Sequence, residues 1–164
     1  MESTVQQKPL GNTGIMLSEI GLGVWKYSGG VEPLRRGVEL GAFLIDTAEV
    51  YRTEDVVGQA IKGIRDHVFI ATKVSGSHLR HDDVLRAAEA SLHELGTDAI
   101  DLYQVHWPNS SVPIAETMKA MAALVDRKQV KYIGVSNFST QQLRRAQAAL
   151  PNHPIVSNQV LYNL

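Results

Sequence analysis

The sequence alternates short β-branched apolar runs with longer segments of helical period, and this alternation limits the possible folds more than any other feature. The runs predict six strands, at residues 20–23, 44–46, 68–73, 99–106, 132–136 and 155–159. The segments between them predict helices of about three turns each, at residues 31–40, 53–64, 82–95, 114–127 and 139–150. Strand starts recur about every 23 to 33 residues, which is typical of βα units with a parallel sheet.

Capping and turn signals support this pattern. Ser139 followed by Gln142 is a capping-box pattern at the start of a helix, and Gly96 stands where a helix C-cap is expected. Ahead of the first βα unit, residues 10–20 contain Asn12-Thr13-Gly14 between short apolar pieces, so we predict a small β-hairpin there.

The length allows two architectures. The 164 residues fit one domain, which we place at residues 1–164. A (β/α)₈ barrel usually needs about 250 residues, so six units would leave a barrel two units short. An open, doubly wound sheet of six strands would be complete at this length.

Composition excludes several classes of function. With 44% hydrophobic residues, 20% charged residues and a net charge of −1, the chain is too apolar for disorder and too neutral to bind nucleic acid nonspecifically. It has no cysteine, and therefore no disulfide framework or Cys-based zinc site. No apolar run approaches the roughly 18 residues that a membrane span needs, and the start of the chain lacks a signal-peptide core. We therefore expect a cytoplasmic protein with no membrane partner.

The apolar strand runs end in polar residues, and these ends locate a candidate site. In parallel α/β folds the carboxyl ends of the strands meet at one rim, where ligands bind. The polar ends are Asp46-Thr47, Thr72-Lys73, Gln104 with His106, Ser136-Asn137, and Asn158-Gln159.

Four of the residues at this rim have complementary chemistry. Lys73 ends an apolar run, where a lysine needs a partner unless it reaches solvent, and Asp46 is either that partner or a loop cap. Tyr51 is either an ordinary half-buried tyrosine or a general acid whose pKa the neighbouring lysine lowers. His106 either bonds to the backbone in the core or lies at the mouth of a site beside Trp107.

Other chemical motifs are missing from the sequence. The remaining five histidines form no metal-ligand pattern, so we expect no metal. Gly21-Leu22-Gly23 follows the first predicted strand, but Lys26 takes the position of the third glycine in a dinucleotide-binding loop, which weakens the open-sheet alternative.

Five motifs, in order and in register, resemble those of the aldo-keto reductases. They are residues 45–51 (Ile-Asp-Thr-Ala-Glu-Val-Tyr), Thr72-Lys73, residues 105–108 (Val-His-Trp-Pro), residues 133–138 (Ile-Gly-Val-Ser-Asn-Phe) and Asn158-Gln159. The resemblance runs from about Leu10 to the last residue and implies a (β/α) TIM-barrel-type fold. Arg52 stands where many members of that family have glycine.

The resemblance also implies a reaction and a set of site residues. NADPH would pass hydride to an aldehyde or ketone while Tyr51 donates a proton, with Asp46, Lys73 and His106 as the other members of a catalytic tetrad. Residues that match those holding the nicotinamide carboxamide are Ser136, Asn137 and Gln159, and those that match the walls of the substrate pocket are Trp25 and Trp107.

Family members continue through two further βα units after the strand of Gln159, so we expect an incomplete barrel without the phosphate-binding loops. Each lost charge-assisted hydrogen bond would weaken cofactor binding by about 1.5 to 3 kcal/mol. We also expect the open strand edges to drive homo-oligomerisation. Two functions stay open: an NADPH-dependent reductase, and a weak or silent homologue that acts as a binding or self-assembling module.

Overall fold

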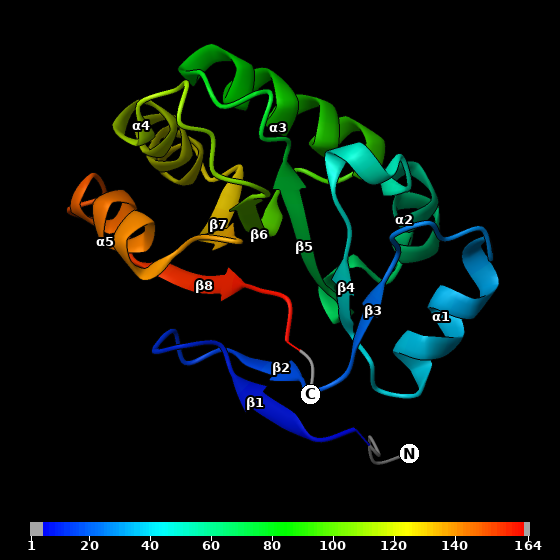
Figure 1. Cartoon of the computed structure of the whole chain (residues 1–164). Coiled ribbons are helices and arrows are strands. Elements are labelled where there is room, and N and C mark those ends of the chain that lie inside the picture. The colour runs from blue at the N-terminus through cyan, green and yellow to red at the C-terminus, as the bar shows by residue number, and fades with distance from the viewer. Residues whose placement is uncertain (1–4, 163–164) are drawn as a thin grey trace.

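The computed structural model describes residues 5–162, which form a curled parallel sheet with helices on its convex side (Figure 1). The six strands of this sheet are β3 (Gly21–Gly23), β4 (Leu44–Asp46), β5 (Phe69–Val74), β6 (Ile100–Val105), β7 (Val130–Ser136) and β8 (Ile155–Gln159). The helices are α1 (Val31–Glu39), α2 (Glu54–Ile61), α3 (His81–Leu95), α4 (Ile114–Asp126) and α5 (Thr140–Ala148), with short 3₁₀ turns at Glu49–Tyr51 and Arg65–His67.

The order of the strands decides between the two architectures. The strands lie side by side in chain order from β3 to β8, and every neighbouring pair is parallel. A doubly wound sheet reverses its strand order at a switch point, whereas a (β/α) barrel adds each strand beside the previous one. The predicted incomplete barrel of six βα-type strands is therefore confirmed, and the open doubly wound sheet is wrong.

A hairpin is confirmed around Asn12-Thr13-Gly14, with β1 (Gln7–Pro9) paired antiparallel with β2 (Met16–Ser18). Its first strand lies before the predicted range of residues 10–20. The hairpin lies across the concave side of the sheet (Figure 1). Leu10 and Leu17 bring it into an inner apolar cluster with three residues on the concave face of the sheet: Phe69, Ala71 and Leu102. A larger cluster, between the convex face and the helices, forms the main core. The side chains of one strand thus alternate between two cores, as the pleat requires.

Both capping predictions are confirmed. The Ser139 side chain accepts from the backbone N–H of Gln142, and the Gln142 side chain accepts from the backbone N–H of Ser139. Gly96 ends α3 in the left-handed conformation, with φ of 61°, which glycine adopts at little cost.

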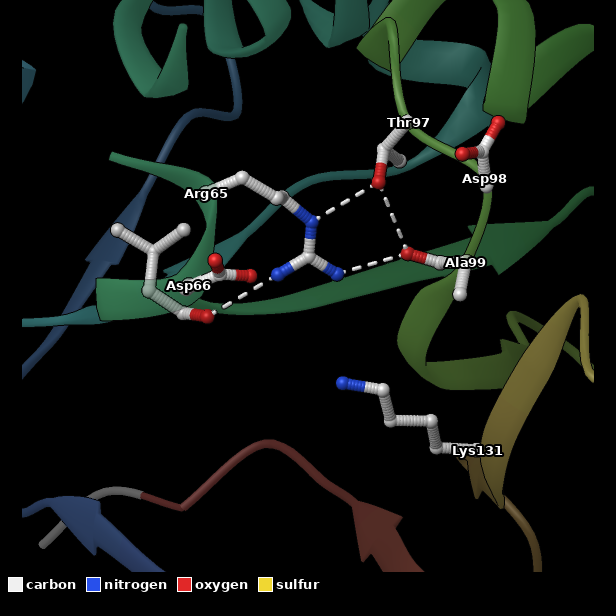
Figure 2. A pocket seen from close by; sticks show the side chains of 7 residues that line it. Arg65, Asp66, Thr97, Asp98, Ala99 and Lys131 are labelled. Atoms are coloured by element: carbon white, nitrogen blue, oxygen red, sulfur yellow. Dashed lines mark hydrogen bonds between the residues drawn. The ribbon is translucent and has the colours of Figure 1, made fainter. Parts of the chain in front are cut away.

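The amino rim of the sheet holds a buried ion cluster around Asp101, whose side chain is 5% exposed. One carboxylate oxygen lies 2.8 Å from Nη2 of Arg65 and accepts the backbone N–H of Ile70, and the other lies 2.7 Å from Nζ of Lys131. Figure 2 shows Arg65 reaching Thr97 and the carbonyl of Ala99 as well. This cluster joins the amino ends of β5, β6 and β7.

Replacing Asp101 should destabilise the fold without changing the arrangement of side chains at the carboxyl ends of the strands. Asp101→Ala removes the partner of two cations and leaves the buried N–H of Ile70 unpaired, so we expect a loss of about 2 kcal/mol of unfolding free energy. Urea unfolding measures it, with Asp98→Ala as the exposed control that should change stability by less than about 0.5 kcal/mol. Equal effects of both substitutions would contradict this role of Asp101.

Candidate active site

The carboxyl rim brings the four predicted tetrad residues together. Lys73 Nζ donates to Asp46 Oδ1 at 2.7 Å and to the carbonyl of Thr47 at 2.8 Å. Tyr51 Oη lies 3.5 Å from Nε2 of His106, and their rings meet edge to face with centroids 5.5 Å apart. Lys73 Nζ is 5.1 Å from the centre of the Tyr51 ring. A phenol, an imidazole, an ammonium and a carboxylate therefore form one continuous group.

The strand register places these side chains. β4 pairs with β5 so that Asp46 lies opposite Ala71, and the N–H of Thr47 continues the ladder to the carbonyl of Ala71. Lys73 follows two residues later on the same face of β5, which brings its ammonium back across to Asp46. The backbone after Thr47 then turns through a single 3₁₀ turn that ends on Tyr51.

Arg52 ends this turn in the left-handed conformation, with φ of 55° and ψ of 43°. That region suits glycine and costs other residues some backbone energy. The left-handed backbone at Arg52 explains why many members of the family that the sequence resembles have glycine at this position. The structure thus keeps a strained residue directly after Tyr51.

Tyr51 retains its proton at neutral pH. Burial raises the pKa of Tyr51 above its ordinary value of 10.0, and the negative charge of Asp46 raises it further. The expected net lowering of this pKa by Lys73 is wrong, because burial and the charge of Asp46 determine the direction of the shift. The ammonium donates to Asp46 and to the carbonyl of Thr47. Tyr51 is therefore a phenol with a proton to donate.

Burial acts on the two neighbouring bases in the opposite direction. It lowers the pKa of Lys73, which is 1% exposed, while Asp46 opposes this shift by its charge and its hydrogen bond. Burial also lowers the pKa of His106, and the positive charge of Lys73 lowers it further. The imidazole is therefore held neutral and can offer one N–H to an oxygen atom.

The three predicted carboxamide-binding residues lie next to one another on this rim. Ser136 Oγ donates to the carbonyl of Gln159 at 2.8 Å, and Asn137 Nδ2 donates to the carbonyl of His106 at 3.1 Å. The Gln159 side chain reaches Asp46, with 3.3 Å between Nε2 and Oδ2. Amide and hydroxyl groups of this kind can both donate to and accept from a primary amide.

One cavity of about 610 Å³ joins these residues to the predicted substrate walls. Its lining residues are Trp25, Val50, Tyr51, His106, Trp107, Ser136, Asn137, Gln159, Val160 and Leu161. Sequence reasoning missed the apolar residues Val50, Val160 and Leu161, although Val50 stands inside the motif that contains Tyr51. Both tryptophans are more than half exposed, so the mouth of the cavity is wide and aromatic.

Sequence reasoning also missed Glu54, a carboxyl that is 6% exposed on the first turn of α2. It accepts hydrogen bonds from Oγ1 of Thr72 at 2.5 Å and from Oγ of Ser91 at 3.1 Å. Burial raises the pKa of Glu54, and the two hydrogen bonds oppose that shift. The sequence offered only a weak signal, since an acidic residue on the first turn of a helix is common.

Residues 5–162 contain neither a metal cluster nor a candidate membrane span. Within them no group of three or more His, Asp or Glu side chains is arranged to hold a metal ion. In the same part of the chain no helix combines the length and the apolar character that a membrane span requires.

Comparisons with known proteins give a consistent result. A family model described as the aldo/keto reductase family matches residues 19–164. The chain is 40% identical to the aldo-keto reductase YhdN of Bacillus subtilis, covering 94% of this chain and 53% of that protein. It is 37% identical to the methylglyoxal reductase YeaE of Escherichia coli, covering 98% and 60%.

Solved structures agree. The thermostable aldo-keto reductase Tm1743, solved with the inhibitor epalrestat, superimposes with a TM-score of 0.92 at 42% identity, over 96% of this chain and 63% of that one. An aldo/keto reductase of Klebsiella pneumoniae in complex with NADP and acetate gives a TM-score of 0.76 at 38% identity, over 90% and 55%. The chain spans about half the length of the curated relatives it matches.

Glu54 should make stability depend on pH. Because its folded-state pKa is raised, the folded chain binds the proton more tightly, and stability falls as pH rises from 4.5 through the folded-state pKa. Glu54→Gln lacks this titration. We therefore expect the stability of the wild type relative to Glu54→Gln to decrease with rising pH in urea unfolding between about pH 4 and pH 8. Exposed Asp55→Asn is the control, and a difference that is independent of pH would contradict this prediction.

Proposed function

The chain belongs to the aldo/keto reductase family, and from this premise we propose that its carboxyl rim serves the reduction of an aldehyde or ketone to an alcohol. The observation that carries the proposal is the convergence of Tyr51 and His106 on one cavity, with a buried Lys73 and Asp46 behind them. A proton donor and a neutral hydrogen-bond donor, 3.5 Å apart, can share one carbonyl oxygen.

The roles of the four residues follow from their protonation states. The carbonyl oxygen accepts a hydrogen bond from His106 and, as negative charge develops on it, the proton of Tyr51. The ammonium of Lys73, with Nζ 5.1 Å from the centre of the Tyr51 ring, would offset part of the cost that burial and Asp46 impose on the tyrosinate that is left. Asp46 holds that ammonium in place, and the tyrosinate recovers its proton from solvent.

We propose NADPH as the cofactor, which supplies the hydride that the carbonyl carbon accepts. Support comes from structural neighbours solved with NADP or NADPH and from the donor and acceptor set of this chain. Ser136, Asn137 and Gln159 present hydroxyl and amide groups at the same cavity as Tyr51, which fits a nicotinamide carboxamide. Trp25 and Trp107 would wall the substrate pocket.

A second candidate is a weak or silent homologue that binds or self-assembles, within one partial barrel domain of residues 1–164. The observation that favours it is that, in the described part of the chain, β3 and β8 each pair with a strand on one side only. Unpaired edges of this kind promote association. Homo-oligomerisation through these edges and a cytoplasmic location both remain predictions. Light scattering at micromolar protein tests the first, and a monomer that unfolds cooperatively would contradict it.

Tyr51→Phe should abolish most of the turnover while cofactor binding persists. It removes one hydroxyl from the cavity, so we expect the rate of carbonyl-dependent NADPH oxidation to fall by about 10²- to 10⁴-fold. Cofactor fluorescence should still report binding. Tyr132→Phe, on β7 at the inner cluster, is the matched control. A Tyr51→Phe variant that works at the wild-type rate would exclude Tyr51 as the donor, and the absence of saturable NADPH binding up to millimolar concentration would exclude the reductase.

A further inference from the structure

The segment that carries Tyr51 is bonded to β5 by a carboxylate on each side of the tyrosine. Glu49 stands two residues before Tyr51, and its Oε2 accepts the backbone N–H of Ser75 at 2.8 Å. Glu54 stands three residues after Tyr51, and its Oε1 accepts the hydroxyl of Thr72 at 2.5 Å. Thr72 and Ser75 in turn stand on either side of Lys73. The two carboxylates thus bracket Tyr51, and their partners bracket Lys73.

Each carboxylate is fixed by a second bond. The other oxygen of Glu49 lies 2.5 Å from Nδ1 of His78, on the loop after β5. The other oxygen of Glu54 accepts the hydroxyl of Ser91 on α3. Both side chains therefore use both oxygens, which restricts their rotation more than a single bond would.

Among the described residues, the other hydrogen bonds from residues 47–54 to β5 come from Thr47, whose N–H donates to the carbonyl of Ala71 and whose carbonyl accepts from Lys73. The backbone bonds of the turn are local, from the N–H of Tyr51 to Ala48 and from that of Arg52 to Glu49. The hydroxyl of Thr53 is hydrogen-bonded to the hydroxyl of Thr47 at 3.1 Å and donates to the carbonyl of Val24 at 3.5 Å. The links to the residues beside Lys73 come from Glu49 and Glu54.

Neither carboxylate belongs to the lining of the cavity that holds Tyr51 and His106. Both instead line a separate cavity of about 400 Å³ together with Arg52 and Glu94. Direct contact with a substrate in the first cavity therefore does not explain them.

We propose that Glu49 and Glu54 are positioning residues that fix Tyr51 relative to Lys73 and His106. This inference rests on the proposed function for its effect on turnover, but the placement of the tyrosine can be measured without any cofactor. Loss of either link should let the phenol move from its partners. A displacement of about 1 Å can cost about 100-fold in rate, and it should act on kcat more than on KM because the substrate contacts remain.

Matched pairs of substitutions separate position from charge. Glu49→Ala removes the charge and the bond to Ser75, whereas Glu49→Gln removes the charge but keeps an oxygen that can accept that N–H. Thr72→Val removes the hydroxyl that donates a hydrogen bond to Glu54 and changes the shape of the side chain little, whereas Thr72→Ser keeps a hydroxyl. Glu94→Gln is the control, because it changes a carboxylate of the same 400 Å³ cavity that has no hydrogen bond to residues 49–54 among those described.

The first readout is the titration of Tyr51, followed by tyrosinate absorbance and assigned by subtracting the same variant with Tyr51→Phe. A loosened, more hydrated phenol should titrate at lower pH than in the wild type, since burial is the main cause of its raised pKa. We expect this shift in Glu49→Ala and Thr72→Val, with most of it reversed in Glu49→Gln and Thr72→Ser. Glu94→Gln should titrate as the wild type does.

The second readout is turnover, with kcat falling about 10- to 100-fold in Glu49→Ala and Thr72→Val and KM changing less than about threefold. Folded variants in which neither the Tyr51 titration nor kcat moves would overturn the inference. If Glu49→Ala does not fold, the near-isosteric pair at Thr72 decides the question. Full turnover in Tyr51→Phe would instead overturn the proposed function, and the titration would still decide whether the carboxylates position Tyr51.

Discussion

The burial of one ammonium group governs the geometry of the carboxyl rim. Lys73 is 1% exposed, and a lysine at that depth keeps its charge only if anionic and carbonyl oxygens surround it. Asp46 and the carbonyl of Thr47 supply those oxygens, at 2.7 and 2.8 Å. Both belong to the end of β4, so the requirement of Lys73 fixes the register of β4 against β5 and, through the turn that follows, the place of Tyr51.

The two rims of the sheet use buried charge in different ways. At the amino rim, Asp101 is shared by Arg65, Lys131 and a backbone N–H, so its carboxylate is saturated by protein donors. At the carboxyl rim, Tyr51 and His106 line an open cavity, and the 3.5 Å between them is long for a hydrogen bond. The amino-rim cluster therefore acts on stability, while the carboxyl rim retains groups that can bind a ligand.

Much of this arrangement could be predicted from the sequence, because it follows from local period and from strand ends. The βα alternation predicts all six strands of the sheet, and the polar residues at their ends predict the rim that holds Asp46, Lys73 and His106. Length could not decide between a barrel and an open sheet, because that depends on which strands become neighbours. The shift of the Tyr51 pKa could not be predicted either, since it depends on how deeply the phenol is buried and on how close Asp46 lies to it. Glu54 could not be identified from the sequence for a similar reason, because its carboxyl is buried only by the packing of α2 against β5 and α3.

Asp46 connects the residues proposed for proton transfer with those proposed for cofactor binding. One of its oxygens accepts from Lys73 at 2.7 Å, and the other lies 3.3 Å from the side-chain nitrogen of Gln159, on the far strand of the sheet. The hydrogen bond to Lys73 is short and charge-assisted, whereas that to Gln159 is long and comes from a neutral amide, so Gln159 is the partner that a competing amide can displace at lower cost. β4 and β8 lie on opposite sides of the curled sheet (Figure 1). The curvature of the sheet therefore brings the Gln159 side chain of β8 within reach of Asp46 on β4.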